Sequence, residues 1–405
     1  MIRLKDTRHA NTAAFLASAI KIAEYYGFTP LESAQQRDRK DARQMRERAA
    51  KNETEIAFAR REERPLVAAA KRLVACARAG TDSLLLWQTS DSGKERGALP
   101  SISLELHIIG NGSAIAEALL IVVANAIAEE CGLRERVLSI NNIGSTESSN
   151  RFVRDVGTYL RKHIESISPT LRPRAALDPL GTLVHLIERG HPAMPRAPQA
   201  MEYLTEDERR RFWDLLEYLE AFGLPYELSP HVLGSRDCWS HSLYQVSGVD
   251  PETGSRIPIA FGGRYDPLAA RFAAAPTSAA TISITCEIRG KVRSKREVAG
   301  VPSIYFAHLG AEARRRSLSV LEILRAAGIP VYQGLTHDRI AEQMAAAHTY
   351  ATPYILIMGH KEAVEGTILV REVATNSQEA VSLPDLPNYL KRHRVSGWKT
   401  SPSIA

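Results

Sequence analysis

The residues best able to do chemistry in this sequence form one short run, Gly262, Gly263, Arg264, Tyr265 and Asp266. A guanidinium, a phenol and a carboxylate side by side can hold a polar or anionic ligand, because arginine binds phosphate and carboxylate groups in a bidentate way. The alternative is a tight turn that follows the paired glycines and is pinned by the same polar side chains for structural reasons alone. The run therefore leaves two alternatives open, ligand binding and structural support.

Other familiar catalytic patterns are absent from the sequence. There is no Walker loop, no GxSxG string, no HExxH string and no cluster with metal-ligand spacing. Four cysteines are scattered without CxxC spacing: Cys76, Cys131, Cys238 and Cys286. This scatter predicts reduced thiols in a cytoplasmic protein, because a zinc site or a disulfide framework needs regular spacing. We expect no metal and no resident cofactor.

Length and composition bound the class of protein. The chain has 405 residues, of which 44% are hydrophobic and 24% charged, which is typical of a globular protein with two or three domains. No apolar run approaches the roughly 20 residues that a membrane helix needs, and the first residues lack the apolar stretch of a signal peptide. The net charge of +6 permits a nucleic-acid partner without requiring one.

Hydrophobic periodicity predicts the elements that position these residues. Residues 1–290 are expected to form an antiparallel sheet backed by helices, with hairpins around residues 84–110 and 238–263. The pattern of Thr205 and Glu208 predicts the capped start of a helix that ends near residue 222. Residues 291–302 are basic and polar and are predicted to be a linker. Residues 303–395 alternate strand and helix as a smaller α/β domain, and residues 396–405 are expected to be a tail.

At this point the sequence resembles a known family. The run from Phe261 to Leu268 is similar to the GGRYD-x-L signature of class II histidyl-tRNA synthetases. Segments that resemble the same family follow in the right order, among them ELHIIGNGSAIAEALL, LSINNIGSTESSNRFVRDVGTYL and, near the end, LRAAGIPVYQG. The resemblance covers nearly the whole chain. It implies a class II catalytic sheet, a homodimer and a C-terminal domain that faces tRNA.

The family's chemistry sets a test for this sequence. Histidine is activated when its carboxylate attacks the α-phosphate of ATP, and the negative charge of the transition state must be met by fixed cations. The family places arginines in its second motif, in its third motif and in an Arg-Gly-Leu-Asp-Tyr-Tyr string. Here the second motif falls on residues 84–109 without an arginine on its first strand, although Lys94 and Arg96 follow in the loop. The family's histidine-binding Gln and Glu align with Ser103 and His107.

The remaining candidates are displaced. The Arg-Gly-Leu-Asp string aligns on residues 234–237, so Arg236 lies two residues beyond the expected arginine, which is roughly 6–7 Å along a strand. Arg289 lies one position late for the third motif. Arg236 and Arg289 are the catalytic candidates that remain. The family's Arg-Pro-Glu-Gly-Thr stretch resembles residues 60–64, so Glu62 is a candidate to hold an ammonium group, with a surface ion pair as the alternative.

Basic residues of the C-terminal domain are the candidates for RNA binding. Several arginines recur on one expected helix, and further cations follow: Arg314, Arg315, Arg325, Arg339 and Lys361. Such residues can face phosphates, and a solvated helix face is the alternative.

Two alternative functions follow from the family residues that are kept and those that are missing. The first is a histidyl-tRNA synthetase-like protein that has lost amino-acid activation and binds tRNA, another RNA or a protein that it regulates. The regulatory precedent is the synthetase-like subunit of ATP phosphoribosyltransferase, which lacks the anticodon domain present here. The second is a divergent but active histidine–tRNA ligase, and only this alternative requires ATP and magnesium.

Overall fold

The computed structural model describes residues 1–32, 63–74, 76, 83–91, 99–133, 135–235, 237–249, 253–273, 276–290, 292, 301–335, 337, 339–393 and 395. The chain forms two compact units, neither of which is continuous in sequence. Unit 1 contains residues 1–12, 29–215 and 225–291. Unit 2 contains residues 13–28, 216–224 and 292–405.

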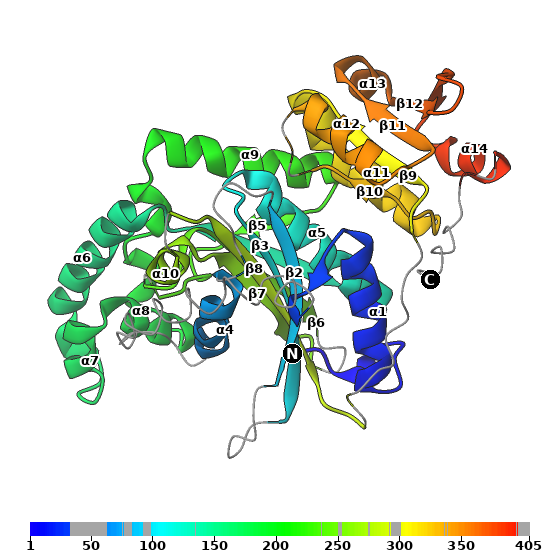
Figure 1. Ribbon diagram of the computed structural model, residues 1–405. Helices are drawn as coiled ribbons and strands as arrows, with labels where there is room; N and C mark the ends of the chain where they lie inside the picture. The colour runs from blue at the N-terminus through cyan, green and yellow to red at the C-terminus, as the bar shows by residue number, and fades with distance from the viewer. Residues whose placement is uncertain are drawn as a thin grey trace. The chain divides into compact units, whose positions relative to one another are not determined.

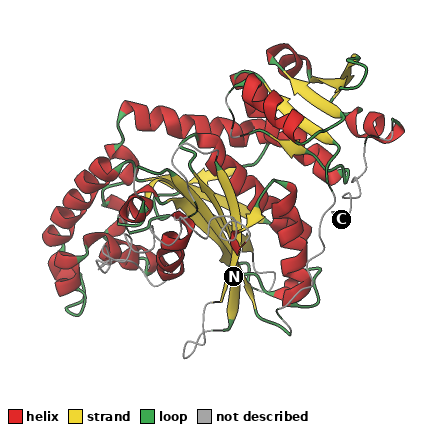
Figure 2. Cartoon of the chain, viewed as in Figure 1, coloured by secondary structure: helices red, strands yellow, loops and turns green. Residues whose placement is uncertain are grey.

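Unit 1 is built on a large sheet whose described strands have the order β1-β2-β3-β8-β7-β6-β4-β5 (Figures 1 and 2). Neighbouring strands are antiparallel except at the two edges, where β1 and β5 run parallel to their neighbours. The strands are Thr29–Pro30 (β1), Leu84–Asp91 (β2), Ser101–Ile109 (β3), Arg136–Asn142 (β4), Tyr226–Leu228 (β5), Ser240–Val249 (β6), Arg256–Arg264 (β7) and Ala279–Glu287 (β8).

The two faces of this sheet differ in chemistry because successive side chains of a strand point to opposite sides. In β3, the even-numbered residues from Ile102 to Ile108 are apolar, whereas Ser103, Glu105 and His107 are polar. The register carries both rows onward, since Glu105 is opposite Ser283 and Leu106 is opposite Ile282 of β8. We call the side of Ser103, Glu105 and His107 the polar face of the sheet.

The opposite face is covered by α5 (Ala114–Glu130), in which every residue from Ala114 to Ala128 is buried. Its apolar side chains pack against β3, β6, β7 and β8. Glu117 is the single charged residue in that buried stretch. A buried carboxylate is costly without a partner, so its position in this helix requires cations nearby.

The other helices of unit 1 are α4 (Arg64–Val74), α6 (Thr146–Lys162), α7 (Arg172–Leu177), α8 (Pro179–Glu188) and α10 (Asp266–Phe272). Figure 1 shows α6, α7 and α8 gathered together beside the large sheet. Residues from these helices join α4, α10 and Trp239 in one hydrophobic core. The helix α9 (Glu206–Phe222) begins in unit 1, and its residues from Leu216 onward belong to unit 2.

Unit 2 carries a second sheet in the order β10-β9-β11-β12-β13. The first three strands are parallel and the last two pairings are antiparallel. The strands are Ile304–His308 (β9), Tyr332–Gln333 (β10), Tyr354–Met358 (β11), Thr367–Glu372 (β12) and Gln378–Ser382 (β13). The helices are α11 (Ala311–Ala326), α12 (Ile340–Thr349), α13 (His360–Glu365) and α14 (Leu386–Arg392), and unit 2 also takes nearly all of α1 (Thr12–Tyr25).

The predicted architecture, an antiparallel sheet with flanking helices followed by a smaller α/β domain, is confirmed. Gly262 and Gly263 lie inside β7, and the chain changes direction after them, between the end of β7 at Arg264 and the start of α10 at Asp266. Both glycines allow the backbone of the neighbouring strands to approach β7 closely. A Cβ on Gly262 would lie 2.2 Å from the Thr281 carbonyl oxygen, and one on Gly263 would lie 2.6 Å from that of Ser242.

The predicted helix start at Thr205 is present as a reciprocal cap. The Glu208 amide donates to Thr205 Oγ1 (3.3 Å), and the Thr205 amide donates to Glu208 Oε2 (2.8 Å). Glu208 also accepts from the Ser145 amide and from Ser148 Oγ at the start of α6, so one carboxylate caps two helices. The predicted linker 291–302 lies largely, and the tail 396–405 entirely, outside the described residues. No described helix is long and apolar enough to cross a membrane.

We expect Glu208→Gln to lower the free energy of unfolding by about 1–3 kcal/mol at pH 7, because backbone amides at two helix starts lose a charged acceptor. Burial alone would raise the pKa of Glu208, but hydrogen bonds from Ser145, Thr205 and Ser148 lower it to about 2. The unfolded value is about 4.3, so this stabilisation is fully present above that pH and is lost as the pH falls towards 2.

Denaturant unfolding of the wild type and Glu208→Gln between pH 7 and pH 2.5 measures this effect. The difference between the two proteins should shrink as the pH falls. The control is Glu206→Gln in the same helical turn, which is exposed and should change stability by less than about 0.5 kcal/mol. A constant difference across this pH range would show that the Glu208 charge does not stabilise the helix starts.

Candidate functional site

Glu105 is the centre of a polar cluster on the polar face. It is 4% exposed and accepts hydrogen bonds from Gln88 Nε2 (2.7 Å) and from Ser90 Oγ. His107 Nε2 lies 3.5 Å from its second oxygen. Burial raises the pKa of Glu105, but the contact with His107 and its charge, with the hydrogen bonds from Ser90 and Gln88, outweigh burial and hold the pKa below its usual value. The cluster therefore holds a buried negative charge among mostly neutral donors.

Cations are missing from the strands around this cluster. The strands β2, β3, β6 and β8 contain no lysine and no arginine at any position. Of the two arginines in β7, Arg264 points to α5 and Arg256 pairs with Glu227 on β5 at 2.6 Å. In these described strands, the polar face next to Glu105 therefore has no lysine or arginine, and its basic neighbour is His107.

A second polar cluster, centred on Glu63, lies beside Gly263 of β7. The Glu63 carboxylate, which is 3% exposed, accepts from the Ser235 amide (2.8 Å), Ser235 Oγ (2.6 Å) and Trp239 Nε1 (2.8 Å). The Trp239 indole lies so close to Gly234 and Gly263 that an added Cβ would be 2.3 Å and 3.2 Å from it. These contacts join Ser235 and Trp239 to the residue before α4. The carboxylate is already satisfied by three donors from the protein.

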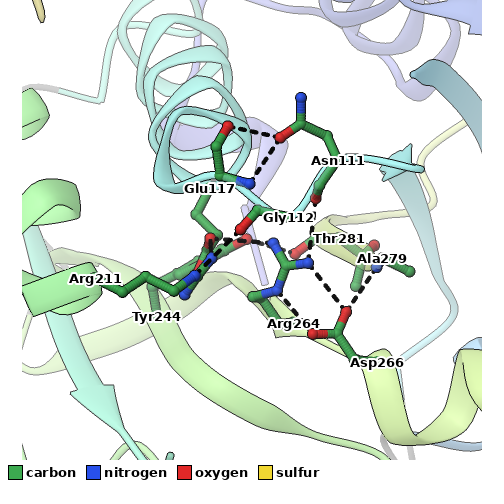
Figure 3. A network of polar contacts seen from close by, with 10 residues as sticks. Asn111, Gly112, Glu117, Arg211, Tyr244, Arg264, Asp266, Ala279 and Thr281 are labelled. Carbon is green, nitrogen blue, oxygen red and sulfur yellow. Dashed lines mark hydrogen bonds and ion pairs between the residues drawn. The ribbon is translucent and has the colours of Figure 1, made fainter. Parts of the chain in front are cut away.

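Arg264 belongs to a buried network on the face covered by α5 (Figure 3). Its Nη1 lies 3.3 Å from Glu117 Oε2, and its Nε and Nη2 donate to the two oxygens of Asp266 at 3.0 and 3.1 Å. Arg211 of α9 donates to both oxygens of Glu117, so two guanidinium groups share this carboxylate. Asp266 Oδ1 also accepts from the Ala279 amide at 2.7 Å.

The charges in this network stabilise one another. Burial would raise the pKa of Glu117, but Arg211 and Arg264 outweigh it and hold the pKa below its usual value. The Arg264 side chain is only 1% exposed, and its polar atoms bond to α5, to α10 and to the Asn111 carbonyl oxygen. This geometry favours the structural alternative for Arg264 and Asp266 over ligand binding.

Tyr265 points to the polar face. It is fully buried, and its ring packs edge-on against His107 with the centroids 6.1 Å apart. Its hydroxyl has no hydrogen-bond partner among the described residues. Burial, with the charges of Asp266 and Glu105 nearby, raises the pKa of Tyr265, so the phenol stays neutral.

The other predicted site residues are not gathered at one place. Glu62, Arg236, Lys94 and Arg96 lie outside the described residues, so their roles stay predictions. Arg289 is exposed in the loop after β8, and its backbone carbonyl accepts from the Thr12 amide at 3.1 Å. It is therefore neither in a strand nor in a helix.

In unit 2, three of the five predicted RNA-binding residues have partners within the protein. Arg314 Nη2 donates to the Leu335 carbonyl, Arg315 pairs with Glu217 at 2.7 Å, and Arg325 pairs with Glu322 at 2.6 Å. Arg339, before α12, and Lys361, on α13, are exposed. The cations available to phosphates are therefore fewer than the sequence indicates.

The buried cysteines are not poised for nucleophilic chemistry. Burial, with Glu63 nearby, raises the pKa of Cys238 to about 12, and burial raises that of Cys131 and Cys286 to about 12 as well. A thiol at such a pKa is protonated at neutral pH. Among the described residues, no three His, Cys, Asp or Glu side chains are placed to hold a metal ion.

Comparison with known proteins adds the family. The family model for the anticodon binding domain matches residues 304–393, which lie in unit 2. Over 301 residues the chain is 27% identical to histidine–tRNA ligase 1 of Shouchella clausii, covering 73% of this chain and 70% of the relative. It is 26% identical over 293 residues to histidine–tRNA ligase of Bacillus subtilis, covering 71% and 69%.

The chain is similar to histidine–tRNA ligases over almost three quarters of its length, and its C-terminal part matches the anticodon binding domain. Solved structures with similarity to it include apo histidyl-tRNA synthetase of S. aureus, with 18% identity, a TM-score of 0.43, and coverage of 80% and 81% of the two chains. Another is an ATP phosphoribosyltransferase regulatory subunit/histidyl-tRNA synthetase of Bacillus halodurans C, with 18% identity, a TM-score of 0.36, and coverage of 73% and 77%.

Sequence reasoning about this synthetase-like protein missed the residues that organise its site. Glu63 lies one residue beyond the predicted Glu62. A shift of one residue in the alignment to the family stretch would select Glu63 instead of Glu62. Glu105 lies between the two aligned positions Ser103 and His107, so the resemblance to the family does not point to it. Glu117 had a readable signal, because one acid in an otherwise apolar helix needs a cationic partner.

We expect Glu117→Gln to lower the free energy of unfolding of the synthetase-like protein by about 3–5 kcal/mol, because it leaves buried guanidinium groups without their shared carboxylate. The matched control is Glu227→Gln, which removes another Glu–Arg pair whose side chains are 41% and 56% exposed. Glu227→Gln should lower the free energy of unfolding by less than about 1 kcal/mol. Denaturant unfolding at pH 7 measures both, and equal losses would contradict a supporting role for the buried network.

Proposed function

We propose that this histidyl-tRNA synthetase-like protein binds tRNA through unit 2 and does not activate histidine. The observation that carries the proposal is the charge of the polar face. Four of its central strands contain no lysine and no arginine, and Glu105 adds a buried carboxylate. Adenylate formation joins a carboxylate to a triphosphate, so it needs fixed cations where this face has an anion.

The segment that resembles the family's Arg-Gly-Leu-Asp-Tyr-Tyr string supports the same proposal. Its Ser235 and Trp239 donate three hydrogen bonds to Glu63, and the indole of Trp239 occupies the space beside Gly263. A carboxylate with three internal donors gains little from a substrate ammonium, because binding one would break existing hydrogen bonds. The protein's own side chains thus take the place of an amino-acid ligand.

The tRNA part of the proposal rests on the anticodon-binding match at residues 304–393. This segment contains nine lysines and arginines and nine aspartates and glutamates, so it has no net charge. With Arg314, Arg315 and Arg325 engaged inside the protein, few phosphate contacts are available. We therefore propose binding in which shape and base contacts outweigh charge. The homodimer and the cytoplasmic location that the family resemblance implies form part of the same proposal.

Histidine-dependent exchange between ATP and pyrophosphate tests the catalytic half. The purified full-length protein should give no exchange above a reaction without histidine, beside an active bacterial histidine–tRNA ligase as the positive control. Exchange well above background would establish the divergent ligase instead. It would assign the missing cations to residues such as Arg236 or Arg289.

Binding of a histidine tRNA transcript at increasing salt tests the other half. We expect a shallow dependence, with a slope of log K against log salt of about −2, because each phosphate contact contributes about −0.7 to −0.9. Replacing Arg339 and Lys361 with glutamine should flatten the slope. Arg315→Gln is the matched control, since its guanidinium already pairs with Glu217. No binding to tRNA would reject this half and favour a protein partner.

A further inference from the structure

Unit 2 contains a stack of three tyrosines at one edge of its sheet. Tyr332 lies on the edge strand β10, directly opposite Tyr305 of β9, and Tyr350 follows the last turn of α12. The rings of Tyr332 and Tyr350 are nearly parallel, with an interplanar angle of 14° and centroids 4.0 Å apart. Tyr305 and Tyr350 are also stacked, at 26° and 6.4 Å.

The solvent-exposed fraction rises from Tyr305 through Tyr332 to Tyr350. Tyr305 is 1% exposed, Tyr332 is half-buried, and Tyr350 is 47% exposed. Tyr350 stacks on Tyr332 and Tyr305, and nearly half of the residue stays exposed to solvent. The stack therefore ends in an aromatic surface that is partly open to solvent.

The protein holds this surface in place from two sides. Tyr332 packs on the hydrophobic cluster that includes Tyr305, Ala347 and Ile355. The Tyr350 amide donates to the Ala346 carbonyl at 2.9 Å, which continues the α12 pattern. The next residue, Ala351, has a left-handed backbone with φ of 48°, a conformation that costs free energy for a residue with a Cβ. The backbone at Tyr350 and the contact of its ring with Tyr332 thus exist before any ligand arrives, which reduces the entropy lost on binding.

The chemistry of the surface selects a flat ligand. Bases stack on exposed aromatic rings of nucleic-acid-binding proteins, and stacking needs no charge on the protein. This suits a segment whose charges sum to zero. A base within a duplex is already stacked on both faces, so the ligand must be an unpaired base.

We propose that Tyr350, supported by Tyr332, is a stacking platform for an unpaired base of the bound tRNA. The inference rests on the proposed function, since it takes RNA as the ligand of unit 2. It adds the residue that makes the contact and the kind of nucleotide that is recognised.

The test is the affinity of the full-length protein for a histidine tRNA transcript at fixed salt. Tyr350→Ala should weaken binding about 5- to 150-fold, which corresponds to the loss of one stacked base. Tyr350→Phe keeps the ring and should bind within about twofold of the wild type. The matched control is Tyr389→Ala, which removes a half-buried tyrosine of α14 that bonds to Glu379 and should leave affinity unchanged.

Thermal unfolding of each variant shows that the fold is intact, and competition identifies the nucleotide. A short single-stranded RNA should compete with the transcript, whereas the same strand in a duplex should compete poorly. If the wild type binds tRNA but Tyr350→Ala binds equally well, the platform is rejected and the proposed function stands. If Tyr350→Phe binds as weakly as Tyr350→Ala, the contact is made by the hydroxyl and the platform is also rejected. If the wild type binds no tRNA, both the proposed function and the platform are rejected.

Discussion

The shared carboxylate of Glu117 is the interaction on which the architecture of unit 1 depends. It lies in a helix that is otherwise apolar and buried, and it joins that helix to β7 through Arg264 and to α9 through Arg211. Burying Glu117, Arg211 or Arg264 without a partner would be unfavourable. Their mutual ion pairs offset the cost of removing each charge from water. Because Arg264 also holds Asp266, the same contact fixes where β7 ends and α10 begins.

Because Arg264 pairs with Glu117, the two faces of the large sheet have different roles. The arginine of the family-like signature is used on the face covered by α5, where it supports the fold. The polar face then has no strand arginine near Glu105, and its neutral donors and Trp239 fill positions close to the sheet. The signature string therefore serves packing in this protein, and such a role does not depend on an activity.

The sequence predicted the architecture well for reasons that are local. Alternating polar and apolar residues specified β3, and the reciprocal pattern at Thr205 and Glu208 specified the start of α9. The need for the paired glycines inside β7 could not be predicted, because it comes from the close approach of backbone that is distant in sequence. Glu63 could not be predicted, since its partners Ser235 and Trp239 lie more than 170 residues away and only the folded chain brings them together. The burial of Arg264 was one of two open alternatives until the partner on α5 was placed.

The position of Glu105 determines what a new cation on the polar face would meet. Its direct cross-strand neighbour is Gln88, and side chains paired in this way have Cβ atoms about 5 Å apart. An arginine introduced at Gln88 would therefore lie next to this carboxylate. The same holds for Ser103, which is on the same face two residues away. Each such arginine would pair with Glu105, so its charge would be partly neutralised for any anionic ligand.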